Sequence, residues 1–163
     1  MSMIDQLLYI KEFREQQAET ALQKSRLVLA DAHQQEAQAR ETLEVFVAKA
    51  REDELLWYRE LCERVVKLRD IEEVQLDVSI VRAEEAARQQ ALDRAQQERE
   101  KAQEGFNSAT HVMKEATTAR NKFEELALNY HAALSKEAER KEDQELEELA
   151  GIVREREELS THD

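Results

Sequence analysis

The stretch that decides the fold is residues 18–57, AETALQKSRLVLADAHQQEAQARETLEVFVAKAREDELLW. Small and apolar side chains recur in it at alternating steps of three and four residues, which places them on one narrow stripe of a helix. Two positions in seven are too few to face a globular core, but they suit a single partner helix. The stretch therefore predicts one helix of a coiled coil. Its stripe begins at Leu8 and continues with Ala18, Leu22, Ser25, Leu29, Ala32, Glu36, Ala39, Leu43, Phe46, Ala50, Asp53 and Trp57.

The composition of the 163 residues agrees with an elongated helical protein. Charged residues make up 37% of the chain, proline is absent, and the two glycines are Gly105 and Gly151. So few apolar residues cannot fill a broad core, yet their heptad order distinguishes the chain from a disordered one. Because little interrupts a helix from Ile4 onward, we expect an all-α fold.

A change of residue composition near the midpoint of the chain predicts where the chain reverses direction. Residues 74–81 are rich in β-branched side chains, which lose rotamer freedom in a helix, and Asp77 and Ser79 are good N-cap residues. We therefore expect a first helix over about 2–73, a turn over about 74–81 and a second helix over about 82–158.

These boundaries predict a single elongated domain over residues 1–163, a long two-helix antiparallel coiled-coil hairpin. Such a hairpin pairs its arms end to end, with Ile4 near Val153 and Leu8 near Leu149. Neither glycine nor proline marks the turn, so a second interpretation stays open, in which one unbroken helix forms a parallel homodimer.

The expected second helix has three parts. It begins with recurring alanines. From Phe106 its apolar stripe contains larger residues, as far as Tyr130 and Leu134. Its last part, residues 137–158, is strongly acidic, but Leu146, Leu149, Ile152 and Val153 keep helical spacing there. The early alanines are Ala83, Ala87, Ala91, Ala95, Ala102 and Ala109, and the later stripe includes Met113, Ala116, Phe123 and Ala127.

The charge of the chain excludes two classes of partner. The formal net charge is −13, spread over both halves, and no basic stripe is present to neutralise phosphates. We therefore expect no nucleic-acid binding and no attraction to an anionic membrane. Residues 1–12 contain neither a basic segment nor a long apolar run, so we expect no signal peptide and no direct membrane insertion. With Cys62 as the single cysteine, the default location is the cytoplasm.

No catalytic motif is present. The histidines at 33, 111, 131 and 162 lack metal-ligand spacing, and no His-Glu-x-x-His or Cys-x-x-Cys occurs. Carboxylate pairs such as Glu72 and Glu73 are frequent, but a two-helix hairpin offers no cavity in which such a pair could act on a substrate. The sequence predicts a protein that is not an enzyme and that holds no metal or cofactor.

Three segments carry more apolar residues than one partner helix covers. The first is Leu55-Leu56-Trp57-Tyr58-x-x-Leu61, which is either a local widening of the core or an exposed anchor for another protein, since Trp and Tyr are preferred at interfaces. Both interpretations stay open. The second segment contains Ile71, Val74, Leu76, Val78, Ile80 and Val81, and the third contains Met3, Ile4, Leu7, Leu8, Tyr9, Ile10 and Phe13.

The opening pattern Leu7-Leu8-x-Ile10-Lys11-x-x-Arg14-Glu15-x-x-Ala18-Glu19-x-Ala21-Leu22 resembles the start of YscO-type proteins of type III secretion systems, which are related in shape to the flagellar export protein FliJ. The chain length, the lack of proline and the patch Trp57-Tyr58-Arg59 also fit. The resemblance implies a non-enzymatic antiparallel coiled coil that acts as the stalk of a hexameric export ATPase. It implies a cytoplasmic protein, peripheral to the inner-membrane secretion apparatus, that links the ATPase ring to the export gate and binds secretion chaperones.

The resemblance also assigns residues to partners. The paired termini would enter the ATPase ring, and the turn would face the cytoplasmic domain of the export gate or a chaperone. The strong acidity of the last helix departs from the family pattern. Two other functions remain open, a structural homodimer that serves as a scaffold rod and a hairpin chaperone for secreted clients. The ring contacts would be Ile4, Leu7, Leu8, Lys11, Arg14, Leu149, Ile152 and Val153, and the gate or chaperone contacts would be Leu56, Trp57, Tyr58, Leu61, Val74, Leu76 and Val78.

Overall fold

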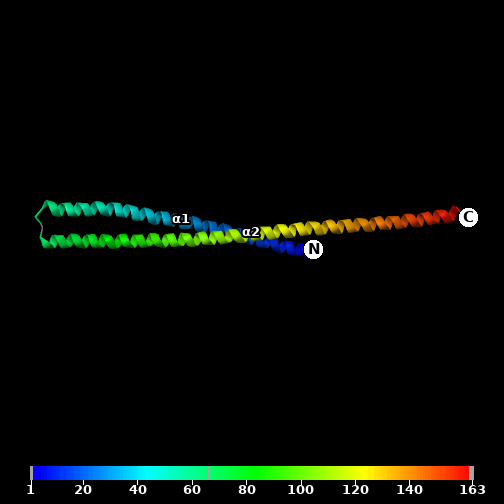
Figure 1. Cartoon of the computed structure of the whole chain (residues 1–163), viewed down its shortest axis with the longest axis horizontal. Helices are drawn as coiled ribbons and strands as arrows, with labels where there is room; N and C mark the ends of the chain where they lie inside the picture. The colour runs from blue at the N-terminus through cyan, green and yellow to red at the C-terminus, as the bar shows by residue number, and fades with distance from the viewer. Residues whose placement is uncertain (1, 66, 162–163) are drawn as a thin grey trace. The chain divides into compact units, whose positions relative to one another are not determined.

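The computed structural model describes residues 2–65 and 67–161. They form two helices, α1 (Met3–Glu63) and α2 (Leu68–Thr161), and the described residues contain no strand (Figure 1). The two helices run antiparallel and pack against each other, with a turn near residue 65. The prediction of an all-α antiparallel coiled-coil hairpin is confirmed, and the alternative of one unbroken helix is wrong.

The first turn of α1 is capped by the side chain of Ser2. The Asp5 backbone N–H donates a hydrogen bond to Ser2 Oγ (3.3 Å), while Ser2 Oγ–H donates to Asp5 Oδ2 (2.7 Å). This exchange satisfies a backbone donor that has no partner within the helix. The Asp5 carboxylate also lies at the positive end of the helix dipole, which favours its negative charge.

The turn lies earlier than the sequence suggested. The expected turn at 74–81 is wrong, because α2 begins at Leu68 and continues through this segment. At its start, Asp70 Oδ2 accepts a hydrogen bond from the Lys67 backbone N–H (3.0 Å). Val74, Val78 and Val81 are half-buried, so packing against α1 outweighs the modest helix penalty of β-branched side chains.

The chain divides into two compact units. Unit 1 combines Met1–Ala18 with Met113–Asp163, and unit 2 is Glu19–Val112. Each unit contains a segment of α1 beside a segment of α2 (Figure 1). The expectation of a single domain over residues 1–163 stays a prediction.

In unit 2 the predicted stripe of α1 is the packing seam. Its members from Leu22 to Trp57 are half-buried or buried, with Ala50 only 3% exposed. The matching seam of α2 also alternates steps of four and three. Among the recurring alanines, Ala83, Ala87 and Ala91 are exposed and lie outside this seam. Alanines spaced by four drift about 40° around the helix at each step, so they leave the stripe. The α2 seam in unit 2 is Val74, Val78, Val81, Glu85, Arg88, Leu92, Ala95, Arg99, Ala102, Phe106 and Ala109.

Charged side chains occupy several seam positions in unit 2. Glu54 is 6% exposed and accepts hydrogen bonds from Arg51 (3.2 Å) and from Arg82 (3.1 Å) across the seam. Arg51 also bridges to both carboxylate oxygens of Glu85 at 2.9 Å. These pairs fix the register of the two helices, because sliding one helix would leave the Glu54 carboxylate buried without a cation.

The pairing in unit 1 follows the same register. Arg120 Nε donates to Glu15 Oε2 (3.0 Å), and His131 Nε2 lies 2.9 Å from Asp5 Oδ1. The expected pairing of Ile4 with Val153 is therefore wrong. Moving the turn along the chain displaces each residue's partner by twice as much, so the N-terminus of α1 lies beside residues 120–131.

The position of the turn can be tested with spin labels on the single native thiol of Cys62, which is exposed. A second label on Glu73→Cys is expected to give a short distance, because the two positions are level across the helix pair, where axes lie about 8–10 Å apart. A label on Asp93→Cys is the matched control and is expected about 30 Å further along the axis. Double electron–electron resonance measures both distances. A shorter distance to Asp93→Cys than to Glu73→Cys would contradict this turn and support one at 74–81.

The charge network can be tested at its buried acid. Replacing Glu54 by Gln removes the charge that two guanidinium groups share, and is expected to lower the free energy of unfolding by about 1–2 kcal/mol, since both arginines keep access to water. The matched control is Glu52→Gln, at an exposed neighbouring position, which is expected to change stability by less than about 0.5 kcal/mol. Thermal unfolding followed by circular dichroism measures both, and equal melting temperatures would contradict the role given to Glu54.

Candidate interaction surfaces

Exposed apolar side chains gather beside the turn of unit 2. They come from the last turns of α1, from Val65 in the connection and from the first turns of α2, and all lie outside the seam. Exposed apolar side chains that the chain itself does not cover are typical of a protein–protein contact. We call this patch the turn surface, and its members are Leu55, Leu56, Tyr58, Val65, Leu68, Leu76 and Ile80.

The structure separates the predicted gate residues into two groups. Trp57, Leu61, Val74 and Val78 are half-buried in the seam, and the register set by Glu54 and its arginines places the first pair level with the second. Leu56, Tyr58 and Leu76 instead belong to the exposed turn surface. Trp57 lies in the seam, as a local widening of the core predicts, whereas Leu56 and Tyr58 are exposed. Their role as an anchor for another protein stays a prediction.

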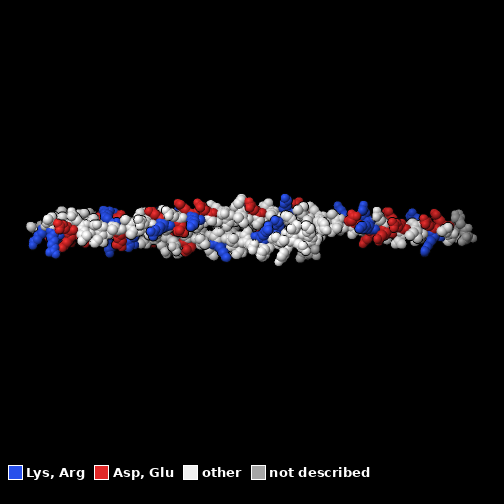
Figure 2. All heavy atoms as spheres, turned by 90° about the horizontal axis from the view of Figure 1, so that it is seen from below, with Lys and Arg blue, Asp and Glu red and all other residues white. Residues whose placement is uncertain are grey.

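A second exposed apolar group lies at the start of α1, in unit 1. Met3, Tyr9, Ile10 and Phe13 are exposed on α1, and Leu126, Leu128, Tyr130 and Leu134 are exposed on the adjoining part of α2. Figure 2 shows this part of unit 1 as a largely uncharged area. We call these eight residues the N-terminal surface.

The predicted ring residues of α1 lie next to this surface, mostly within the seam. Ile4, Leu7 and Leu8 are half-buried, and Lys11 places its Nζ 5.2 Å from the ring centroid of Phe123, a cation–π contact. Arg14 is exposed. The Leu8–Ala18 stripe thus has no gap, because the charged residues Lys11 and Glu15 fill the two seam positions that a search for apolar residues passes over.

The electrostatics of unit 1 centre on two carboxylates that face α2. The hydrogen bond from His131, with that from Ser2, lowers the pKa of Asp5 below its ordinary value of 3.8. The hydrogen bond to Glu15 raises the pKa of Arg120, which keeps this guanidinium charged beside its partner. Both pairs attach the start of α1 to α2 and leave the apolar side chains of the N-terminal surface uncovered.

The remaining predicted ring residues lie elsewhere on α2. Leu149, Ile152 and Val153 are each more than half exposed and lie 18 or more residues beyond His131, which is about 27 Å along a helix. Together with Leu146 they form a patch that we call the C-terminal stripe. The structure does not bring the two predicted groups of ring residues together. The start of α1 lies beside His131 of α2, and the stripe follows well beyond that point.

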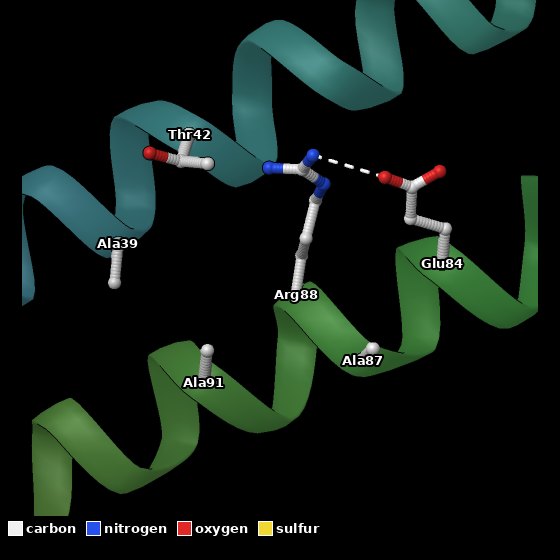
Figure 3. Close-up of a pocket in the computed structure, with 6 residues that line it drawn as sticks. All are labelled: Ala39, Thr42, Glu84, Ala87, Arg88 and Ala91. Carbon is white, nitrogen blue, oxygen red and sulfur yellow. Dashed lines mark hydrogen bonds and ion pairs between the residues drawn. The ribbon is translucent and has the colours of Figure 1, made fainter.

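Unit 2 also contains shallow grooves beside the seam. The groove in Figure 3 has a volume of about 450 Å³ and is lined by Ala39, Thr42, Glu84, Ala87, Arg88 and Ala91. Its one cation is already engaged, because Arg88 donates to Glu84 (3.0 Å) and its guanidinium lies 4.6 Å from the Phe46 ring centroid. Small side chains explain the hollow, and no set of polar groups converges in it to orient a ligand.

No reaction chemistry is visible in residues 2–65 and 67–161. These residues contain no cluster of three or more acidic, His or Cys side chains that could hold a metal ion, and His162 lies outside them. Neither described helix has an apolar segment long enough to cross a membrane. What the surface does offer is apolar contact area on helices, which suits binding of other proteins.

Comparisons with known proteins agree with this arrangement. The sequence model described as "Type III secretion protein YscO" matches residues 4–151. The crystal structure of the type III secretion protein YscO from Vibrio parahaemolyticus aligns with a TM-score of 0.81 at 22% identity, over 90% of this chain and 92% of that chain. The comparison with curated protein sequences gave no match.

The contact between Asp5 and His131 predicts a measurable titration. Because the pKa of Asp5 is lowered, the stabilising contribution of its carboxylate is complete above the ordinary value of 3.8 and is lost as the pH falls through the lowered pKa. In His131→Ala the pKa of Asp5 is expected to rise towards 3.8, as NMR of the carboxyl carbon would show. His33→Ala, in unit 2, is the matched control and should leave it unchanged; an Asp5 pKa that ignores the loss of His131 would contradict the assignment.

Proposed function

This chain belongs to the YscO family of type III secretion proteins, and we propose that it is a non-enzymatic stalk that links the export ATPase ring to the export gate. The observation that carries the proposal is the presence of separate apolar contact surfaces in the two units. The N-terminal surface belongs to unit 1 and the turn surface to unit 2. A coupling protein needs at least two such surfaces, one for each assembly that it joins.

The seam supports this function because it fixes the residues of each surface at defined positions within their own unit. In each unit, α1 and α2 present a regular seam with charged pairs that resist slipping. A mobile linker would join two partners equally well but would transmit little force or displacement between them. Long paired helices suit a mechanical link better.

We assign the ring contact to unit 1. The proposed contact residues are Ile4, Leu7, Leu8, Lys11 and Arg14, on the part of α1 that borders the N-terminal surface, with Leu149, Ile152 and Val153 as a separate contact further along α2. Among these, Arg14 and the three residues of the stripe are the most accessible. The half-buried members act by positioning their exposed neighbours.

We assign the gate contact to the turn surface, where Leu56, Tyr58 and Leu76 are exposed and Trp57, Leu61, Val74 and Val78 support them from the seam. The resemblance to the family also supports secretion chaperones as partners of the same surface. The protein would act in the cytoplasm, peripheral to the inner-membrane secretion apparatus.

The alternative of a parallel homodimeric rod is disfavoured by the seam charges. In a parallel pair in register each seam residue faces its own copy, so Glu36 would meet Glu36 and Arg99 would meet Arg99. In the hairpin these two residues instead form an ion pair with each other.

Two matched variants separate the proposed contacts. Phe13→Ala with Arg14→Ala changes exposed residues at the N-terminal surface, and Leu56→Ala with Tyr58→Ala changes exposed residues at the turn surface. The first variant is expected to lower the stimulation of the purified export ATPase by about tenfold and to spare binding to the gate's cytoplasmic domain. The second is expected to do the reverse.

Leu27→Ala with Val28→Ala is the control, because these exposed apolar residues lie away from both surfaces. All three variants should melt within about 2 °C of the parent protein, since none removes a buried side chain. Absence of any effect of the parent protein on the ATPase, or equal loss of both activities in both variants, would overturn the proposed function.

A further inference from the structure

The C-terminal stripe lies beyond the seam that α1 covers. The α2 seam of unit 1 passes through Arg120, Phe123 and Ala127, and His131 contacts Asp5 near the start of α1. The four apolar residues of the stripe follow at helical spacing, the first of them about 22 Å along the helix past His131. The stripe is therefore an apolar face on a part of α2 that α1 does not reach.

This face has no partner within the described chain. From Leu128 to Thr161 every residue of α2 except Gly151 is exposed, and Figure 1 shows this part of α2 continuing past the start of α1. A lone helix gains little from burial, and α2 is held there by local contacts such as the ion pair of Arg140 with Glu137 (2.9 Å). An amphipathic helix without a covered face is suited to docking on another molecule.

The charge around the stripe identifies the chemistry of that molecule. Residues 137–158 contain ten acidic and four basic side chains, so this segment carries a net charge of −6. Figure 2 shows acidic side chains along this part of α2, with basic ones among them. A second copy of the chain would bring the same negative segment against it, and nucleic acid or an anionic membrane would repel it.

We propose that residues 142–159 form a docking helix that enters a groove on another protein, with an apolar floor that receives Leu146, Leu149, Ile152 and Val153 and a rim of Lys and Arg that faces the acidic side chains. From Leu146 to Val153 the stripe covers about two turns, roughly 11 Å, so an apolar floor of that length is enough to receive it. The inference deepens the proposed function and rests on it, since that function already assigns Leu149, Ile152 and Val153 as contacts and the inference adds the chemistry of their partner.

The test uses the full chain and a designed probe, a labelled helical peptide of about three heptads with Leu at positions a and d and Lys at e and g. A matched peptide has Glu in place of every Lys. Fluorescence anisotropy is expected to show binding of the basic peptide at least tenfold tighter than that of the acidic one. Raising the salt from about 0.05 M to about 0.5 M is expected to weaken the basic complex about tenfold, because the Debye length shortens.

Variants locate the binding on the chain. Leu149→Ser with Val153→Ser is expected to weaken binding of the basic peptide about tenfold, and Glu147→Gln with Glu148→Gln about threefold, both with unchanged helicity. Leu27→Ser with Val28→Ser, at exposed apolar residues of unit 2, is the matched control and should bind as the parent does.

Equal affinity for the two peptides, parent-like binding by the stripe variants, or an equal loss in the control would each overturn the inference. None of these outcomes depends on the stimulation of the export ATPase. A failure of the docking helix is therefore distinguishable from a failure of the proposed function.

Discussion

The arrangement of this protein depends on the register between α1 and α2, and oppositely charged side chains across the seam determine that register. Glu36 pairs with Arg99, and Glu54 is held between Arg51 and Arg82. Apolar heptads alone allow a helix pair to slip by seven residues, because one alanine or leucine replaces another at little cost. A slip here would bury carboxylates against apolar neighbours, which costs several times more than a lost apolar contact.

The same charges decide the partner of α1. Unit 1 contains the pair Glu15–Arg120 and unit 2 the pair Glu36–Arg99, and in sequence the two acids are three heptads apart, as are the two arginines. The acids are on α1 and the arginines on α2, so only an antiparallel arrangement of α1 with α2 satisfies both. Pairing of like helices in register would instead place like charges opposite each other at both positions, glutamates for α1 and arginines for α2. The charged seam residues therefore act against self-association as well as for the hairpin.

The sequence predicts the helices and the stripe well because both follow from periodicity, and the stripe residues from Ala18 to Trp57 repeat that period without interruption. The turn could not be located, because the cues at 74–81 are local and weak, each worth a few tenths of a kcal/mol, whereas packing of Val74, Val78 and Val81 along the seam is worth more. A search for apolar residues does not find Lys11 and Glu15 as seam members, because it counts their charged ends and not the aliphatic stems that pack in the seam.

The contact surfaces were predicted only as segments, for a geometric reason. Trp57 and Tyr58 are adjacent in the chain, but successive residues of a helix point about 100° apart, so one is half-buried in the seam while the other is exposed. Assigning each residue to the seam or to the surface requires the exact phase of the partner helix. The rotational orientation of the partner helix depends on the position of the turn, which the sequence does not locate.

The position of the turn also determines which residues remain without a partner. With the turn at 74–81, α1 would have covered the acidic segment, and its leucines would have been ordinary seam residues. With α1 ending at Glu63, the helices contain 61 and 94 residues, and the excess falls at the end of α2. The acidity that seemed a departure from the family pattern then has a physical reason: a helix that remains in water needs charge to stay soluble, and the same charge selects a basic partner. The unequal lengths of the two helices are what convert an apolar stripe into a surface for binding.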